Sequence, residues 1–332
     1  MFLVVKSGRW GYINRQGVEV IPCQFDAARD FSQELAAVKT GGVWGFIGTN
    51  GAFRLEPRYT QVGDFSSGLA PVETSGAWGY IDRKGKLAIT ERFERCRNFC
   101  EGLAAVSIAE RWWFIGTSGR QVGATYEAVR DFAEGRAAFA TGGRYGYIDS
   151  RGREVIGAQF VEAGDFCEQK ARVRTGTKWG FIDKSGRFVI SPTYDGCGDF
   201  SEGLAPACIG SDWGFVDAKG SWRINPQYQA AQVFSDGLAP VLRDLKWGYV
   251  DPEGSMVIDN RFFLAFPFVE GLALVLPDIF HYGYIDRYGD YVWGPVELLG
   301  MEPDDFLERM VQYWEQLMRS ARTKEFLRRE MF

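Results

Sequence analysis

Trp78-Gly79-Tyr80-Ile81-Asp82-Arg83-Lys84-Gly85 is one of nine copies of the phrase Trp-Gly-aromatic-Ile-Asp-x-x-Gly in this chain. The copies begin at the anchor residues Trp10, Trp44, Trp78, Trp112, Tyr145, Trp179, Trp213, Trp247 and Tyr282. The steps between anchors are 34, 34, 34, 33, 34, 34, 34 and 35 residues. A fixed period of this length is typical of repeat architectures. The sequence therefore predicts one repeat array rather than two ordinary globular domains.

Each repeat contains three short runs of strand-forming residues. In the third copy these are residues 69–72, 78–81 and 87–89. The second run is rich in aromatic residues, which favour strands. The segment from Asp82 to Gly85 has the residues of a tight turn between the second and third runs. The repeat unit is therefore predicted to be a three-stranded antiparallel meander.

Glycine holds two fixed places in the repeat. The Gly that closes the turn is present in all nine copies, which indicates a backbone with positive φ. The Gly after the anchor is present in eight copies, with Trp113 as the exception. A glycine inside a strand usually marks a close approach of other atoms. We expect a neighbouring aromatic ring to lie flat over it.

Two aromatic residues recur in each linker between repeats, so that each unit supplies about four aromatic side chains with its anchor phrase. One three-stranded unit cannot bury these rings, but stacked units can. Residues 1–297 hold nine complete units, and a propeller blade typically has four strands rather than three. The predicted architecture is an all-β array, open and twisted or superhelical, with a closed propeller-like ring as the alternative.

The composition excludes several classes of protein. Of 332 residues, 46% are hydrophobic and 15% aromatic, so the chain has ample core material. A net charge of −5 argues against a nucleic-acid partner. The sequence has no run of 18 apolar residues, so it predicts no membrane span. The N-terminus does not resemble a signal peptide, so we expect a cytoplasmic location. The six cysteines fit buried free thiols in a reducing compartment.

No arrangement of residues points to catalysis. His281 is the only histidine, and we expect it to be structural. One histidine and scattered cysteines do not make a metal site. Phosphate-binding loops and nucleophile elbows are absent from the sequence. We therefore expect no enzyme activity, no cofactor and no metal.

Charge follows the repeat. The five residues around each linker Phe contain twelve acids and neither Lys nor Arg across eight linkers. The predicted turns after the anchor phrase instead carry Arg15, Arg83, Lys84, Arg151, Lys184, Lys219 and Arg287. If the units stack in register, one edge of the array is acidic and another is basic.

Two explanations of the acids stay open. Asp-Phe-x-Glu resembles a capping box on a single helical turn, which would make the acids structural. Alternatively, the acidic stripe binds a basic partner protein and steers its approach. The candidate partner-binding acids are Glu101, Glu134, Glu168 and Glu202.

Three tryptophans lie outside the aromatic pattern of the repeat. No other copy has Trp at the positions of Trp222 and Trp293, and Trp113 replaces a glycine. Tryptophan is common at the centre of protein interfaces. These residues are candidate interface anchors, or they fill the core locally.

Residues 301–332 break the repeat and predict an amphipathic helix. Pro303 and neighbouring acids are helix-start signals, and the segment has helical spacing of apolar residues. The predicted apolar stripe contains Phe306, Met310, Tyr313, Trp314 and Leu317. The helix is interpreted as a cap on the array, as a docking element for a partner or a second copy of the chain, or as a membrane-surface helix.

The repeat resembles the WG-repeat, or KWG-repeat, family of bacterial proteins. The resemblance covers residues 1 to about 295 and rests on the Trp-Gly phrase, the Gly-Leu-Ala-x-Val strand and the Asp-Phe-x-x-Gly linker. Copy four departs from it at Trp113, and Gly48 and Gly116 replace the turn Asp. The resemblance implies a β-rich repeat that binds proteins, without a shared catalytic residue. The predicted function is a non-enzymatic scaffold, an adaptor or inhibitor, with a carbohydrate- or cell-wall-binding module as the alternative.

Overall fold

The computed structural model describes residues 1–298, and every regular element in this range is a β-strand. The chain forms two compact units. The first comprises Met1–Val5, Arg9–Ile13 and Glu19–Phe160. The second comprises Lys6–Gly8, Asn14–Val18 and the described residues from Val161 onward. The predicted helix over residues 301–332 lies outside the described residues.

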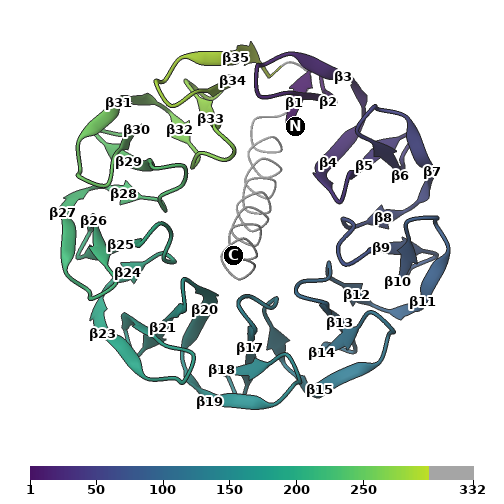
Figure 1. The fold of residues 1–332 in the computed structure, drawn as a ribbon, viewed down its shortest axis with the longest axis horizontal. Helices are drawn as coiled ribbons and strands as arrows, with labels where there is room; N and C mark the ends of the chain where they lie inside the picture. The colour runs from purple at the N-terminus through teal and green to yellow at the C-terminus, as the bar shows by residue number, and fades with distance from the viewer. Residues whose placement is uncertain (299–332) are drawn as a thin grey trace, which may run out of the picture. The chain divides into compact units, whose positions relative to one another are not determined.

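Each repeat forms one antiparallel sheet in which the strands follow chain order (Figure 1). Each sheet contains a strand that directly precedes the strand carrying the anchor. In chain order these strands are β1 (Phe2–Lys6), β5 (Leu35–Thr40), β9 (Leu69–Thr74), β13 (Leu103–Ile108), β17 (Arg136–Thr141), β21 (Lys170–Thr175), β25 (Leu204–Ile209), β29 (Ala239–Arg243) and β33 (Ala273–Leu276). The next strand carries the anchor and is here called the anchor strand. In chain order the anchor strands are β2 (Arg9–Ile13), β6 (Val43–Gly48), β10 (Ala77–Asp82), β14 (Arg111–Gly116), β18 (Arg144–Asp149), β22 (Lys178–Ile182), β26 (Asp212–Asp217), β30 (Lys246–Val250) and β34 (His281–Ile285).

The last strand of each sheet is here called the closing strand. The closing strands are β3 (Glu19–Phe25), β7 (Phe53–Tyr59), β11 (Leu87–Phe93), β15 (Gln121–Tyr126), β19 (Glu154–Phe160), β23 (Phe188–Tyr194), β27 (Trp222–Tyr228), β31 (Met256–Phe262) and β35 (Tyr291–Glu297). These three strands correspond to the predicted meander, which the structure confirms.

The prediction of three strands per unit is wrong for eight of the nine sheets. A further strand forms in the linker and pairs with the strand that follows it. The linker strands are β4 (Ala27–Ser32), β8 (Gln61–Val62), β12 (Arg95–Cys96), β16 (Ala128–Val129), β20 (Glu162–Cys167), β24 (Gly196–Cys197), β28 (Ala230–Ala231) and β32 (Leu264–Ala265). Six of them have only two residues, too few for a pattern in the sequence to reveal. The resulting four-stranded sheets are those of a propeller blade.

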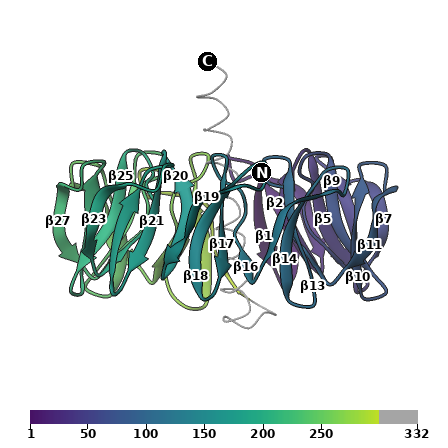
Figure 2. The same ribbon diagram turned by 90° about the horizontal axis from the view of Figure 1, so that it is seen from below.

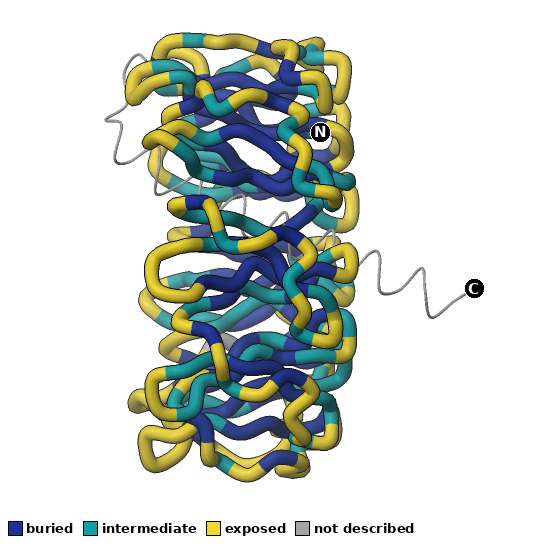
Figure 3. Tube along the Cα trace, turned by 90° about the vertical axis from the view of Figure 1, so that its left-hand side faces the viewer, coloured by how far each residue is buried: buried dark blue, intermediate teal, exposed yellow. Residues whose placement is uncertain are grey.

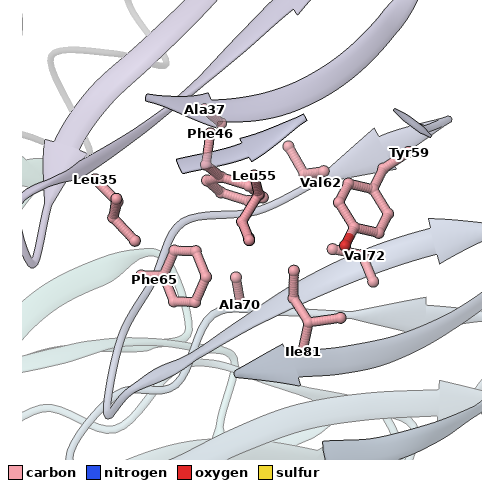
Figure 4. Packing of buried hydrophobic residues seen from close by; sticks show 10 residues of the cluster. All are labelled: Leu35, Ala37, Phe46, Leu55, Tyr59, Val62, Phe65, Ala70, Val72 and Ile81. Atoms are coloured by element: carbon pink, nitrogen blue, oxygen red, sulfur yellow. The ribbon is translucent and has the colours of Figure 1, made fainter. Parts of the chain in front are cut away.

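The core lies between neighbouring sheets. In the first unit, Leu35 and Phe46 of one sheet pack against Phe65, Val72 and Ile81 of the next (Figure 4). The rings of Phe46 and Phe65 are 4.8 Å apart and nearly edge to face. The anchor strands and the strands before them are buried at their centres, whereas the turns are exposed (Figure 3). Each sheet therefore depends on its neighbour to remove its aromatic side chains from water, at about 1.5–3 kcal/mol for each fully buried side chain.

The glycine after the anchor is explained by backbone, not by an aromatic ring. A Cβ placed on Gly45 would lie 2.7 Å from the Leu55 carbonyl oxygen. A Cβ on Gly214 would lie 2.4 Å from that of Ile224. Both carbonyls belong to the bulged part of the closing strand, where the register shifts. The expectation of a ring over this glycine is therefore wrong, because the bulge itself fills the space.

Contacts within the second unit join the first repeat to the last. Arg15 forms an ion pair of 3.0 Å with Glu270. A Cβ on Gly17 would lie 2.1 Å from the Val292 carbonyl oxygen, and Lys6 Nζ lies 5.8 Å from the centre of the Trp293 ring. An open array would leave the first and last repeats apart. The prediction of an open array is therefore wrong, and the closed alternative fits these contacts.

Candidate functional site

The candidate acids lie at the tips of two-residue hairpin turns, here called the linker turns. In one of them, Ala133 and Arg136 exchange backbone hydrogen bonds of 2.8 and 3.1 Å. The two central residues, Glu134 and Gly135, have φ values of 51° and 76°. This geometry is a type I′ turn, which requires positive φ at both central positions. The predicted capping box on a helical turn is wrong for these segments.

The first central residue of every linker turn has φ between 50° and 54° although none is glycine. These residues are Gln33, Ser67, Glu101, Glu134, Glu168, Glu202, Asp236 and Glu270. Such a backbone costs about 1 kcal/mol or more for an ordinary side chain. A repeated cost of this kind calls for a compensating interaction.

The compensating interaction is a hydrogen bond to the next repeat. The carboxylate of Glu101 accepts from the Gly135 N–H at 2.8 Å, and that of Glu202 accepts from the Gly237 N–H at 3.0 Å. The same bond links three further pairs: Glu168 to Gly203 at 3.0 Å, Asp236 to Gly271 at 2.7 Å and Gln33 to Gly68 at 3.0 Å. This series is here called the turn ladder. It gives the candidate acids a structural role that the sequence did not reveal.

The strands of each sheet run between its two ends (Figure 2). The linker turn and the turn after the anchor phrase, here called the basic turn, lie at the same end because two antiparallel strands separate them. In the sheet β8–β11, Leu69 pairs with Asp82, so the linker turn before Leu69 lies beside the turn that begins at Asp82. Arg83 of that turn reaches Glu34 of the preceding linker turn at 3.5 Å. The prediction of separate acidic and basic edges is wrong, because both turns lie two strands apart in an antiparallel meander.

Acids elsewhere in the repeat are held by the fold. Asp64 is almost fully buried and accepts from Arg29 Nε at 2.9 Å. Asp131 and Asp199 are likewise bound by an arginine of the preceding repeat. These linker aspartates connect repeats and offer little charge to a partner.

The turn aspartates are held by their own backbone. In the turn after Asp149, the N–H groups of Arg153 and Arg151 donate to its carboxylate at 3.0 Å. These bonds, led by that from Arg153, lower the pKa of Asp149 to about 2. Hydrogen bonds within their own turns also lower the pKa of Asp183, through the Ser185 hydroxyl, and of Asp217, through the Ser221 N–H. A carboxylate held in this way is a poor proton acceptor near neutral pH.

The three tryptophans outside the pattern pack locally. The Trp113 ring lies 6.1 Å from that of Phe93, and the Trp222 ring lies 5.7 Å from that of Tyr194. Trp293 is buried against Tyr282, with ring centres 5.2 Å apart. Trp113 and Trp222 remain partly exposed.

Within the part of the chain that the structure describes, no group of three His, Cys, Asp or Glu side chains could hold a metal ion. All six cysteines are free thiols. Burial raises the pKa of Cys96 and of Cys197 to about 12, so neither is a ready nucleophile. His281 is hydrogen-bonded to Asp278 at 2.9 Å. Between residues 1 and 298 no helix is long and apolar enough to cross a membrane.

The docking stripe predicted for the C-terminal segment cannot be placed. Phe306, Met310, Tyr313, Trp314 and Leu317 lie outside the described residues. Their role as a cap or a docking element stays a prediction.

These sheets, most of them four-stranded and packed against their neighbours within each unit, define an all-β repeat protein with propeller-type blades. The family model described as the WG containing repeat matches residues 10–44, 44–76, 78–112, 145–179, 179–211, 213–244 and 247–276. The chain therefore belongs to the WG-repeat family, as its anchor phrases predicted. The two copies without a match begin at Trp112, where Trp113 replaces the glycine, and at Tyr282.

Solved structures support the fold. The crystal structure of the eukaryotic initiation factor is similar with a TM-score of 0.60 and 14% identity, covering 87% of this chain and 94% of that chain. BamB from Moraxella catarrhalis has a TM-score of 0.45 and 11% identity, covering 79% and 94%. The designed Ika8 protein has a TM-score of 0.46 and 10% identity, covering 74% and 91%. No curated protein matches the chain. The first of these likenesses shows the fold alone, and the other two are too weak to support an argument.

Proposed function

We propose that this chain is a non-enzymatic scaffold that binds a basic segment of a partner protein along its linker turns. The observation that carries the proposal is the contrast between Gln33 and Glu202. Both side chains accept the ladder bond at 3.0 Å, so a neutral amide is sufficient for it. The ladder bond therefore does not require the negative charge of Glu101, Glu168 and Glu202, and this charge suits an encounter with a basic surface.

Exposure supports these residues over the other acids of the repeat. Glu101 and Glu202 are exposed at turn tips, whereas Asp64 is buried and paired with Arg29. Glu134 and Glu168 are half-buried at the same turn position. Within each unit, neighbouring sheets present such tips one after another, which suits a partner segment bound at more than one point.

The finer features of the function are part of the same proposal. The scaffold acts as an adaptor or inhibitor in the cytoplasm and does no chemistry of its own. The alternative of a carbohydrate- or cell-wall-binding module has less support, because aromatic residues of the repeat such as Tyr12, Tyr80 and Tyr147 are fully buried. Sugar stacking needs exposed ring faces.

Charge reversal tests the proposal. The partner is first identified by capture on the full-length chain and purified. Its affinity is then measured for the wild type and for a variant carrying Glu134→Lys, Glu168→Lys and Glu202→Lys. We expect binding to be lost, and wild-type binding to weaken as salt is raised, because exposed charges are screened.

A second variant controls for net charge. Glu56 and Asp259 are exposed acids on closing strands, and Asp212 is an exposed acid at the start of β26, at the end of its sheet opposite the linker turn. Reversing these three to lysine changes the net charge by the same amount, and partner affinity should stay at the wild-type value. Equal loss in both triple variants, or no loss in the first, would refute the proposed site.

A further inference from the structure

The closing strand of copy four, β15, has an unprotected edge. Its sequence is Gln121-Val122-Gly123-Ala124-Thr125-Tyr126, with neither a charged residue nor a proline. Each of the other eight closing strands contains at least one of these, as in β7 with Arg54, Glu56, Pro57 and Arg58. Charges and prolines on edge strands prevent pairing with another chain. β15 is thus the exception among the nine closing strands of the described residues.

The bulge pattern sets β15 apart in the same direction. The register with the neighbouring strand shifts once in β15 and twice in the other closing strands, as for β7. β15 also has six residues where the others have seven. Bulges twist an edge away from a partner strand, so β15 has lost the second of two such bulges. It keeps the first, between Val122 and Tyr126, in which Gly123 has a φ of 75°.

The edge of β15 is accessible. β15 ends the sheet order β12-β13-β14-β15, with no strand on its far side among the described residues. Gln121, Gly123, Ala124 and Thr125 are exposed. In an edge strand alternate residues turn their backbone groups away from the sheet. The Gln121 amide covers the Gly123 carbonyl at 3.1 Å, a bond that a backbone N–H of a pairing strand would replace one for one.

The charges that flank β15 select the occupant. Arg120 precedes the strand and Glu127 follows it, and both are exposed. The Glu127 carboxylate also accepts from the Gly142 and Gly143 N–H groups of its own chain at 3.0 and 3.3 Å. In an antiparallel pair of identical strands, Arg120 of each copy faces Glu127 of the other. The two-fold axis therefore relates two Arg–Glu pairs of opposite charge, one at each end of the paired strands. A parallel pair would instead bring like charges together.

We propose that β15 pairs antiparallel with β15 of a second copy of this chain, joining two sheets edge to edge. The contact is small, so the resulting dimer is of the weak, reversible kind. It is separate from the linker turns and does not depend on a partner protein.

Sedimentation equilibrium of the purified full-length chain, over a range of concentrations, tests this pairing. Ala124→Pro removes an edge N–H at a place where Pro57, Pro192 and Pro226 stand in other closing strands, so the fold accommodates it. Ala158→Pro makes the same change at the same place in β19. We expect reversible dimerisation of the wild type, weakening of about tenfold or more by Ala124→Pro, and none by Ala158→Pro.

Two further variants keep the test independent of any folding effect of proline. Thr125→Arg adds a charge that Arg58, Arg92 and Arg261 carry at the same place, and it should weaken dimerisation. Arg120→Glu should do the same by facing Glu127 of the other copy. A wild type that stays monomeric at its highest soluble concentration would overturn the pairing. So would dimerisation unchanged in Ala124→Pro and Thr125→Arg, or weakened equally by Ala158→Pro. None of these measurements involves a partner, so failure here leaves the linker-turn proposal to its own test.

Discussion

The Glu202 carboxylate accepts a hydrogen bond of 3.0 Å from the Gly237 N–H, which lies in the equivalent turn of the next repeat. Glu202→Ala leaves that N–H without its acceptor and should lower the free energy of unfolding by about 0.5–1.5 kcal/mol. Glu202→Gln should change it little, because Gln33 makes the same bond to Gly68. Urea unfolding of the two variants measures the difference, and equal destabilisation by both would show that the bond itself is not what matters.

The turn ladder has a gap that a mutation can close. Ser67 occupies the ladder position before Gly102, but its side chain is too short to reach, and among residues 1–298 the Gly102 N–H has no partner. Ser67→Glu supplies a carboxylate of the length found at Glu101. We expect a gain of about 0.5–1 kcal/mol in unfolding free energy, measured by thermal or urea unfolding. Ser66→Glu is the control, because position 66 lies outside the turn tip, and a similar gain there would argue against the ladder.

The glycine after the anchor tolerates no side chain where the closing strand bulges over it. Gly214→Ala places a Cβ 2.4 Å from the Ile224 carbonyl oxygen and should cost about 1–3 kcal/mol or more. Gly157 has nothing within 4 Å of the same added atom and no positive φ. Gly157→Ala should therefore range from no effect to a gain of about 1 kcal/mol. Denaturation of Gly214→Ala and Gly157→Ala tests whether the bulge excludes a side chain at the glycine after the anchor. An equal loss of stability in the two variants would contradict this explanation.

The pH dependence of stability should reflect the turn aspartates. The folded-state pKa of Asp149 is lowered to about 2, chiefly by the Arg153 N–H, so its contribution is present above its ordinary value of about 4. It is lost as the pH falls toward 2. Asn14 holds the first turn with its amide oxygen, bonding the N–H groups of Gln16 and Val18 at 3.0 Å. Asp149→Asn should therefore fold, and should be less stable than the wild type at neutral pH. The difference should shrink between about pH 4 and pH 2, and a constant difference would contradict the assignment.

The sequence predicted the repeat, its strands and the turns, because these depend on local residue types. The Asp82 turn, with its closing Gly85, is formed as predicted. The linker strands were missed because a two-residue strand such as Gln61–Val62 forms only by pairing with β9. In the predicted division these residues belong to the linker between repeats. The presence of the linker strands gives the four-stranded sheets that the count of three strands had argued against.

The role of the acids could not be predicted, because it depends on a contact between repeats. The run Asp131-Phe132-Ala133-Glu134 fits a capping box and a hairpin equally well by local pattern. Only the positive φ of Glu134 and Gly135 distinguishes the two. The closeness of Arg83 to Glu34 likewise follows from antiparallel order within a sheet and packing between sheets. A sequence signal did exist for copy four, since its step of 33 residues and its Trp113 both mark the sheet with the altered closing strand.

One measurement separates the charge of the linker turns from their hydrogen bonds. The variant Glu101→Gln, Glu134→Gln, Glu168→Gln and Glu202→Gln keeps every acceptor of the turn ladder and removes four negative charges. Its unfolding free energy and its affinity for the captured partner are measured side by side with the wild type. If the linker turns bind a basic partner, stability stays nearly unchanged while affinity falls at least about tenfold. Wild-type affinity in this variant would contradict the proposed function and leave the carboxylates with a structural role alone.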